Sequence, residues 1–129
     1  MLLQIARALR REAHASGITG GQATILGFVD SNPELGMGDL AACLGVSAPA
    51  LTRYVDRLVR GGLVTRVRAT DDARKITLEL TPKGLRTLRS VRSRRTAWLA
   101  TRLDEIAPED RDRIEAAIDS LQQLLDQPR

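Results

Sequence analysis

The chain has 129 residues, a single cysteine and a net charge of +4. This length suits one compact domain with its own core, and a single cysteine excludes an intrachain disulfide and a CxxC metal motif. Neither a membrane-spanning run of about 18 apolar residues nor the pattern of a secretory signal is found, so we expect a cytoplasmic protein.

Charged side chains are distributed unevenly along the chain. Residues 51–102 carry 14 basic and 4 acidic side chains, whereas residues 103–129 carry 3 basic and 8 acidic ones. A basic segment beside an acidic tail is typical of proteins that bind a polyanion. A solvated helix surface would give the same pattern, so the charge distribution leaves both interpretations open.

The chain is predicted to begin with two helices. Apolar residues with a period near 3.6 predict a helix over 2–15, which Gly17 ends. Thr19 is suited to capping a second helix. Pro33 stops this second helix, because the residue before a proline is disfavoured in the helical conformation.

Two short helices joined by a tight turn are predicted over 39–60. The first is expected to start at Asp39, as N-cap or first-turn residue, and to end at Gly45. Ser47 is suited to capping the second, and Pro49 lies in its first turn, where no backbone hydrogen bond is lost. A helix, a tight turn and a helix form a helix-turn-helix.

The period of the apolar residues then changes to two, which predicts half-buried strands over 63–68 and 76–80. The polar segment 69–75 between them is predicted to be a hairpin tip, and it carries Arg74 and Lys75. A basic hairpin directly after a helix-turn-helix is a wing.

The rest of the chain is predicted to be helical. Thr81 is suited to capping a long helix with Pro82 at its first position. Its apolar positions continue to Ile106, and Pro108 starts a last helix.

The order of these elements, together with several short motifs, resembles the MarR family of bacterial regulators. The motifs are LAxxLGVS at 40–47, LTRYVDRL at 51–58, GLV at 62–64, DxR at 72–74 and LTPKG at 80–84. The resemblance covers nearly the whole chain.

The resemblance implies a mainly α-helical fold with one small β-hairpin (an α+β class), in a single domain over 1–129. It implies a winged helix-turn-helix at 19–81, a connecting long helix at 82–106, and dimerisation helices at 1–15 and 100–129. It also implies a homodimeric regulator, more often a repressor than an activator, on a palindromic operator. Many members of the family respond to small phenolic or other anionic ligands, so an effector of this kind is a further expected partner.

The second helix of a helix-turn-helix enters the major groove with its N-terminus first. If Leu51, Val55 and Leu58 face inward, the opposite side of this helix is left to meet DNA. Arg53 is expected to fork onto guanine O6 and N7, and Ser47 to bind a phosphate at the positive end of the helix. The residues expected to contact double-stranded DNA are Ser47, Ala48, Pro49, Thr52, Arg53, Arg57, Arg74 and Lys75.

The remaining charged residues of this region have more than one interpretation. Arg57 lies farther along the helix, where it would bind a phosphate without specifying a base, or simply be solvated. Arg74 suits the narrow minor groove of an A·T-rich step. Asp72 cannot favour DNA by its charge, so it is expected to brace an arginine or the turn of the wing. Arg66 and Arg68 could touch the DNA backbone or be solvated strand residues.

Few residues outside this surface indicate a ligand. Arg10 and His14, near the end of the first helix, are candidates for holding an anionic group, and Trp98 for a pocket wall or the dimer core. One histidine without a cluster of carboxylates or thiolates predicts neither a metal site nor a cofactor. Cys43 is expected to be a small buried apolar residue.

The sequence predicts a regulator and not an enzyme, because it has no glycine-rich phosphate loop and no nucleophile with a base at motif spacing. The alternative from another class is a winged-helix module that binds a partner protein instead of DNA. The scarcity of aromatic residues also leaves open a regulator that responds to no effector.

Overall fold

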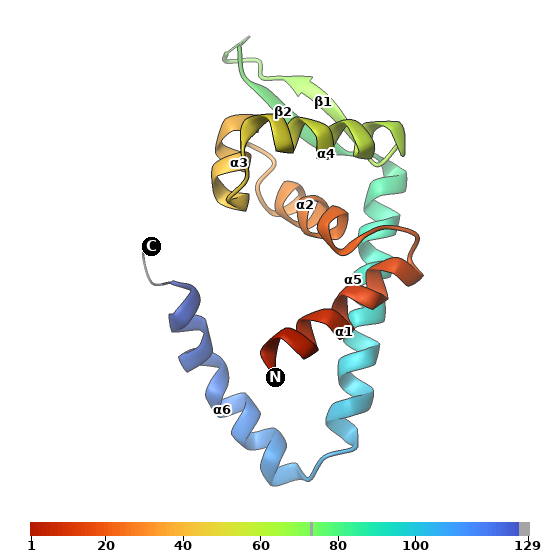
Figure 1. Cartoon of the computed structure of the whole chain (residues 1–129), viewed down its shortest axis with the longest axis vertical. Coiled ribbons are helices and arrows are strands. Elements are labelled where there is room, and N and C mark those ends of the chain that lie inside the picture. The colour runs from red at the N-terminus through yellow and green to blue at the C-terminus, as the bar shows by residue number, and fades with distance from the viewer. Residues whose placement is uncertain (73, 127–129) are drawn as a thin grey trace. The chain divides into compact units, whose positions relative to one another are not determined.

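The computed structural model describes residues 1–72 and 74–126. In this part of the chain helices predominate and the strands form one antiparallel hairpin, which confirms the predicted fold class (Figure 1). The chain divides into two compact units, residues 1–95 and residues 96–129. Among the described helices, none has the length and apolar character that crossing a membrane requires.

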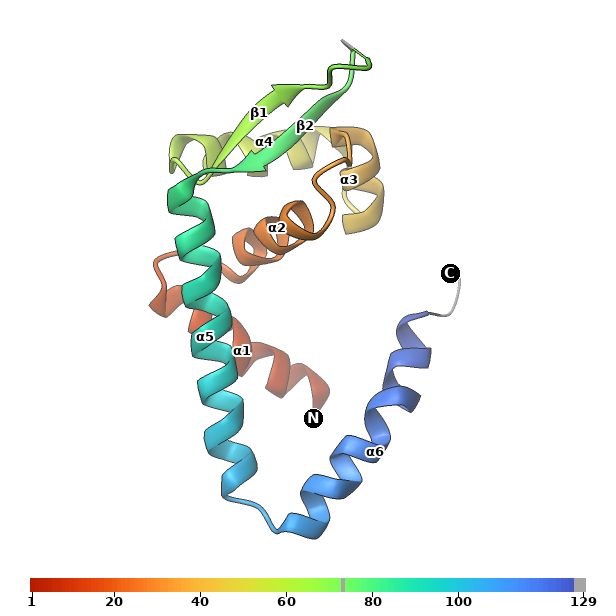
Figure 2. The ribbon, with the colours of Figure 1, turned by 180° about the vertical axis from the view of Figure 1, so that it is seen from behind.

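The elements follow the predicted order. They are α1 (Leu2–Ala15), α2 (Gly20–Ser31), α3 (Met37–Leu44), α4 (Ala48–Arg60), β1 (Val64–Arg68), β2 (Ile76–Leu80), α5 (Pro82–Asp104) and α6 (Pro108–Leu125). The register of the hairpin pairs Val64 with Leu80 and Arg68 with Ile76. The hairpin extends beyond α3 and α4 at its tip, and at its other end β2 leads directly into α5 (Figure 2).

Side-chain caps define where several helices begin. Thr19 and Gln22 form a reciprocal capping box at the start of α2. The Ser47 hydroxyl accepts a hydrogen bond from the Ala50 N–H at 3.2 Å, which starts α4. The Thr81 hydroxyl accepts one from a backbone N–H in the first turn of α5 at 3.0 Å. The caps predicted at Thr19, Ser47 and Thr81 are therefore confirmed.

Helix α3 begins earlier than predicted. Its N-cap is Gly36, and Asp39 lies within the first turn, which is one of the two positions predicted for it. Gly36 also forms an isolated bridge with Thr77 of β2, so the chain contacts the hairpin and then turns directly into the helix. At the other end Gly45 adopts a left-handed conformation with φ of 66°, as expected for a glycine that ends a helix.

The prediction that Cys43 is buried is wrong, because its side chain is exposed on α3. Leu40 and Ala41 are the buried residues of this short helix, and Leu44 packs partly buried against the same core. Cys43 lies on the other side of the helix, so its apolar neighbours in the sequence do not bury it.

One hydrophobic core holds the first unit together and fixes α4 relative to the hairpin. The stripe predicted to face inward on α4 is buried, with Leu51 1% and Val55 and Leu58 0% exposed. It meets Val64 of β1 and residues of α2, α3 and α5 in the same core. Truncating a buried leucine in such a core costs about 2–5 kcal/mol, so this packing determines which side of α4 is left exposed.

The start of α5 is tied closely to the end of α4. The Thr81 hydroxyl and the Lys83 amino group donate hydrogen bonds to the carbonyls of residues 61–62, which follow α4. Gly84 allows the close approach, since a Cβ atom there would lie 2.0 Å from the carbonyl oxygen of Leu63.

The second unit holds the end of α5 and the whole of α6. None of the described residues of α6 is buried. Its exposed large apolar side chains are Ile114, Ile118, Leu121, Leu124 and Leu125. Their spacing places them on one side of the helix, and an exposed apolar stripe of this kind is typical of a helix that packs against another protein surface.

Candidate nucleic-acid interface

Helices α3 and α4 form the helix-turn-helix, and the hairpin lies beside them (Figures 1 and 2). Helix α3 contacts both α4 and β2, and α4 contacts β1. The turn at Gly45 and the cap at Ser47 fix the direction in which α4 starts. The second helix and the hairpin are thus held by the same core.

The predicted contact residues at the cap and in the N-terminal half of α4 are all exposed, and Pro49 and Arg53 lie on the side opposite the buried stripe. The exposed residues are Ser47, Ala48, Pro49, Thr52 and Arg53. Among the described residues, Arg53 has no carboxylate within ion-pair distance. Its guanidinium is therefore available to a ligand.

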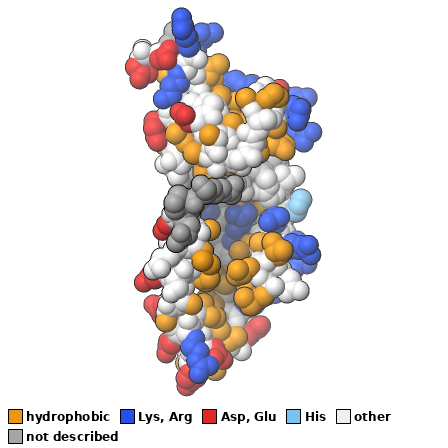
Figure 3. Space-filling model, turned by 60° about the vertical axis from the view of Figure 1, so that its left-hand side comes forward, with side chains coloured by type: hydrophobic (Ala, Val, Ile, Leu, Met, Phe, Trp, Pro, Cys, Tyr) orange, Lys and Arg blue, Asp and Glu red, His pale blue; other side chains and the backbone are white. Residues whose placement is uncertain are grey.

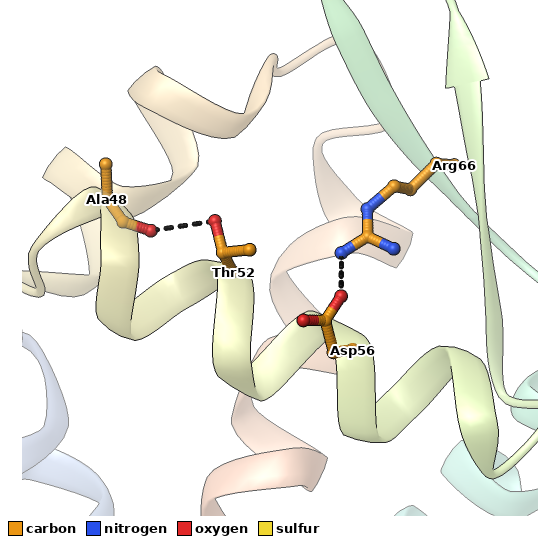
Figure 4. A network of polar contacts seen from close by, with 4 residues as sticks. All are labelled: Ala48, Thr52, Asp56 and Arg66. Carbon is orange, nitrogen blue, oxygen red and sulfur yellow. Dashed lines mark hydrogen bonds and ion pairs between the residues drawn. The ribbon is translucent and has the colours of Figure 1, made fainter.

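Two polar contacts lie along the edge of α4 that faces the hairpin (Figure 4). The Thr52 hydroxyl donates a hydrogen bond to the Ala48 carbonyl at 3.0 Å. From β1, Arg66 reaches α4, where its Nη2 lies 2.5 Å from Oδ1 of Asp56. The ion pair links the second helix of the helix-turn-helix directly to the hairpin.

Sequence reasoning missed this partner of Arg66, which it treated as a solvated or phosphate-binding strand residue. Arg66 lies on the same face of the hairpin as the buried Val64, two residues earlier, and opposite the buried Leu78. Side chains two positions apart on a strand point to the same face, so Arg66 points toward α4. The alternation around Val64 is the signal that could have predicted it.

Arg57 lies one turn beyond Arg53 and nearer the edge of the exposed side of α4. With Tyr54 it lines a cavity of about 400 Å³, which the start of α2 and the end of α3 also line. The structure thus places Arg57 beside the predicted base-contacting residues and not among them.

The tip of the hairpin is organised by Asp72. Its Oδ1 accepts a hydrogen bond from the Arg74 N–H at 2.9 Å, and its carbonyl accepts one from the Lys75 N–H at 3.0 Å. Arg74 is exposed, whereas Lys75 is half-buried and its side chain lies against Gly36. At the top of Figure 3, where the hairpin ends, Lys and Arg side chains lie beside Asp and Glu side chains.

The residues predicted to bind a small ligand lie in different units. Arg10 and His14 are exposed on α1 and line the same hollow of about 440 Å³, together with other arginines of that helix. Trp98 belongs to the second unit, where the Arg102 guanidinium lies 4.2 Å from the centre of its ring. No group of His, Cys, Asp and Glu within the described residues could hold a metal ion.

A helix-turn-helix with an exposed second helix, followed at once by a charged hairpin on the same core, defines a winged helix-turn-helix protein. This is a class of DNA-binding proteins in which the second helix recognises bases.

Comparison with known proteins shows which family the chain resembles. The MarR family model matches residues 16–75, from the end of α1 to the tip of the hairpin. The uncharacterized HTH-type transcriptional regulator Mb0904 of Mycobacterium bovis is 26% identical over 126 residues, which cover 98% of this chain and 88% of the relative. Over residues 16–75 the chain is similar to the MarR family, and the relative that it matches along almost its whole length is named as a transcriptional regulator.

Solved structures share the fold of this chain. The crystal structure of RV1404 from Mycobacterium tuberculosis has a TM-score of 0.80 at 27% identity, over 95% of this chain and 88% of that one. A mutant of S. aureus MepR bound to an oligodeoxyribonucleotide has a TM-score of 0.72 at 19% identity, over 95% of this chain and 90% of that one.

Proposed function

We propose that this chain is a transcriptional repressor that binds a palindromic operator in double-stranded DNA as a homodimer. The observation that carries the proposal is the exposed Arg53 on the outer side of α4, beside a charged hairpin fixed on the same core. Arg53 forks onto O6 and N7 of a guanine in the major groove, a contact that discriminates against other bases by about 1–3 kcal/mol.

Contacts to the DNA backbone position α4 in the groove. Ser47 lies at the positive end of the α4 dipole, where its hydroxyl and the first N–H groups of the helix favour a phosphate. Ala48 and Pro49 are small and exposed, so the helix can approach the base edges closely. Arg57, near the edge of the helix, binds a phosphate and thereby sets the register without specifying a base.

The hairpin acts as the wing. Arg74 enters the minor groove beside the site of α4, where a narrow A·T-rich step has the most negative potential. Asp72 holds the turn through its bond to the Arg74 N–H. Lys75, which lies lower on the hairpin against Gly36, binds a backbone phosphate.

Dimerisation supplies the second half of the interface. The apolar stripe of α6 and the exposed apolar residues at the start of α1 are the surfaces that a second copy would cover. A two-fold dimer places two α4 helices about 34–36 Å apart, which is one turn of DNA and accounts for a palindromic site. A dimer over a promoter blocks transcription by occupying the DNA.

A small anionic ligand is the proposed effector, bound in the hollow that Arg10 and His14 line on α1. Such a ligand weakens DNA binding by the difference between its affinities for the DNA-bound and the free forms of the dimer. Titration of the protein–DNA complex with a panel of small aromatic carboxylates, using the wild type and Arg10→Ala, tests this part separately.

The main experiment is selection of bound sequences from random duplexes, followed by gel-shift titration of the enriched duplex. We expect an inverted repeat with half-sites one helical turn apart, and a relaxed base preference for Arg53→Ala. Arg94→Ala is the matched control, because it removes an equal charge from an exposed position on α5. Equal binding of all duplexes by the wild type would overturn the proposal.

A further inference from the structure

Asp56 places a carboxylate on the part of α4 proposed to enter the major groove. It follows Thr52 by about one helical turn, on the edge of the helix that faces the hairpin (Figure 4). The side chain of Asp56 is 48% exposed. Because DNA is a polyanion, a carboxylate at this place is repelled by the phosphates unless it is neutralised and accepts a hydrogen bond.

Arg66 neutralises this carboxylate but adds little to the stability of the fold. The Arg66 side chain is 33% exposed, so water screens its attraction to Asp56. Exposed pairs of this kind contribute less than about 1 kcal/mol. The main effect of the pair is that the Asp56 carboxylate is held in one position, with its charge balanced, at the surface that meets DNA.

The α4 side chains on this edge accept hydrogen bonds but have no proton left to donate. The Thr52 hydroxyl uses its proton in the bond to the Ala48 carbonyl, and a carboxylate has none. Oδ1 of Asp56 accepts from Arg66, and no described residue donates to Oδ2. This edge is therefore complementary to a base that presents a hydrogen-bond donor.

Cytosine is the base that fits this edge best. In the major groove it presents the N4 amino group and no acceptor of its own. Adenine presents the N7 acceptor beside its amino group, and thymine and guanine present acceptors only. An acceptor facing the Asp56 carboxylate would repel it, so each of these bases is disfavoured relative to cytosine.

We propose that Asp56 is a specificity-determining residue that accepts a hydrogen bond from N4 of one cytosine in each half of the operator. Arg66 is the positioning residue, since it holds the carboxylate from the hairpin side. This inference rests on the proposed function, because it needs α4 in the major groove. It adds a second determinant of base preference to the one assigned to Arg53.

The test uses the duplex enriched by selection and its variants with each base at each half-site position. For the wild type we expect one position at which cytosine is preferred over thymine by on the order of 10-fold. For Asp56→Asn, whose amide can also donate, we expect this ratio to fall below about 3-fold while the preferences at other positions persist. Asp30→Asn is the matched control, because Asp30 also pairs with an arginine, Arg92, at 3.0 Å, but on α2.

A second measurement needs only the wild type. N4-methylcytosine at the sensitive position keeps its Watson–Crick pair but blocks the groove-facing N–H, so we expect the affinity to fall on the order of 10-fold. The same modification at another cytosine should have little effect. Equal weakening of all duplexes by Asp56→Asn would show that the residue only supports the structure, and would overturn the inference while leaving the proposed function intact. Loss of all base preference in the wild type would overturn both.

Discussion

Replacing Gly84 by alanine tests how closely the start of α5 must approach the turn between α4 and β1. A Cβ atom at this position would lie 2.0 Å from the carbonyl oxygen of Leu63 and 2.9 Å from its carbonyl carbon. Contacts below 3.0 Å are not tolerated, and both atoms belong to backbone, which cannot rotate away as the end of a side chain can. Either α5 or the strand must therefore move.

The free-energy cost of this movement depends on the hydrogen bonds between the start of α5 and the turn after α4. The side chains of Thr81 and Lys83 bond to the carbonyls of residues 61–62, so a shift of α5 breaks or stretches both bonds. Overpacking with loss of these bonds costs about 3 kcal/mol. For a domain of this size, such a loss lowers Tm by roughly 10–20 °C.

Thermal unfolding followed by circular dichroism measures the effect. Gly27→Ala is the matched control, because Gly27 lies within α2 and nothing would come within 4 Å of a Cβ atom there. This control should gain stability, by about 0.5–1 kcal/mol, since alanine is the better helix former. A Gly84→Ala protein as stable as the wild type would refute the idea that α5 must approach the turn between α4 and β1 this closely.

The other predictions concern DNA binding and assembly. The logarithm of the operator affinity, measured by fluorescence anisotropy, is expected to fall linearly with the logarithm of the salt concentration. Arg57→Ala is expected to reduce the slope of this line by about one unit. An affinity that does not change with salt would favour a protein partner. Asp72→Ala removes the hydrogen bond to the Arg74 N–H, so the affinity for A·T-flanked duplexes is expected to fall about 2- to 10-fold in gel shifts. Asp71→Ala removes the same charge and is the control, which should leave this affinity unchanged. Ile118→Asp places a charge on the apolar stripe of α6 and should raise the dimer dissociation constant at least about 10-fold in sedimentation equilibrium; an unchanged constant would exclude that stripe from the interface.

Local signals predicted most of the fold. The caps at Ser47 and Thr81 and the stripe of Leu51, Val55 and Leu58 depend on residues within a few positions of one another, and all lie where the sequence placed them. The exposed side of α4 follows from the same stripe, because the side opposite a buried stripe faces solvent. The candidate contact residues on α4 could therefore be found without a structure.

What the sequence could not predict depends on contacts between distant segments. Helix α3 is too short for its apolar residues to define a period, so the exposure of Cys43 was not evident. Its start at Gly36 depends on a bridge to Thr77, which lies far along the chain. The Asp56–Arg66 pair likewise joins a helix to a strand. The alternation around Val64 indicates the face on which Arg66 lies, but only the structure shows that Asp56 is the residue it meets.

Arg53 and Asp56, two of the charged residues of α4, differ in a way that matters for DNA recognition. Arg53 has no ion-pair partner in the described part of the chain, so it can fork onto a guanine without first breaking a salt bridge. Asp56 is held by Arg66 before DNA arrives, which lowers the entropy lost on binding and keeps the carboxylate from adding to the repulsion by phosphates. A surface with both residues unpaired would bind DNA with less preference, because its carboxylate would turn away from the groove. The pairing of Asp56 is thus expected to add to the base preference that Arg53 supplies.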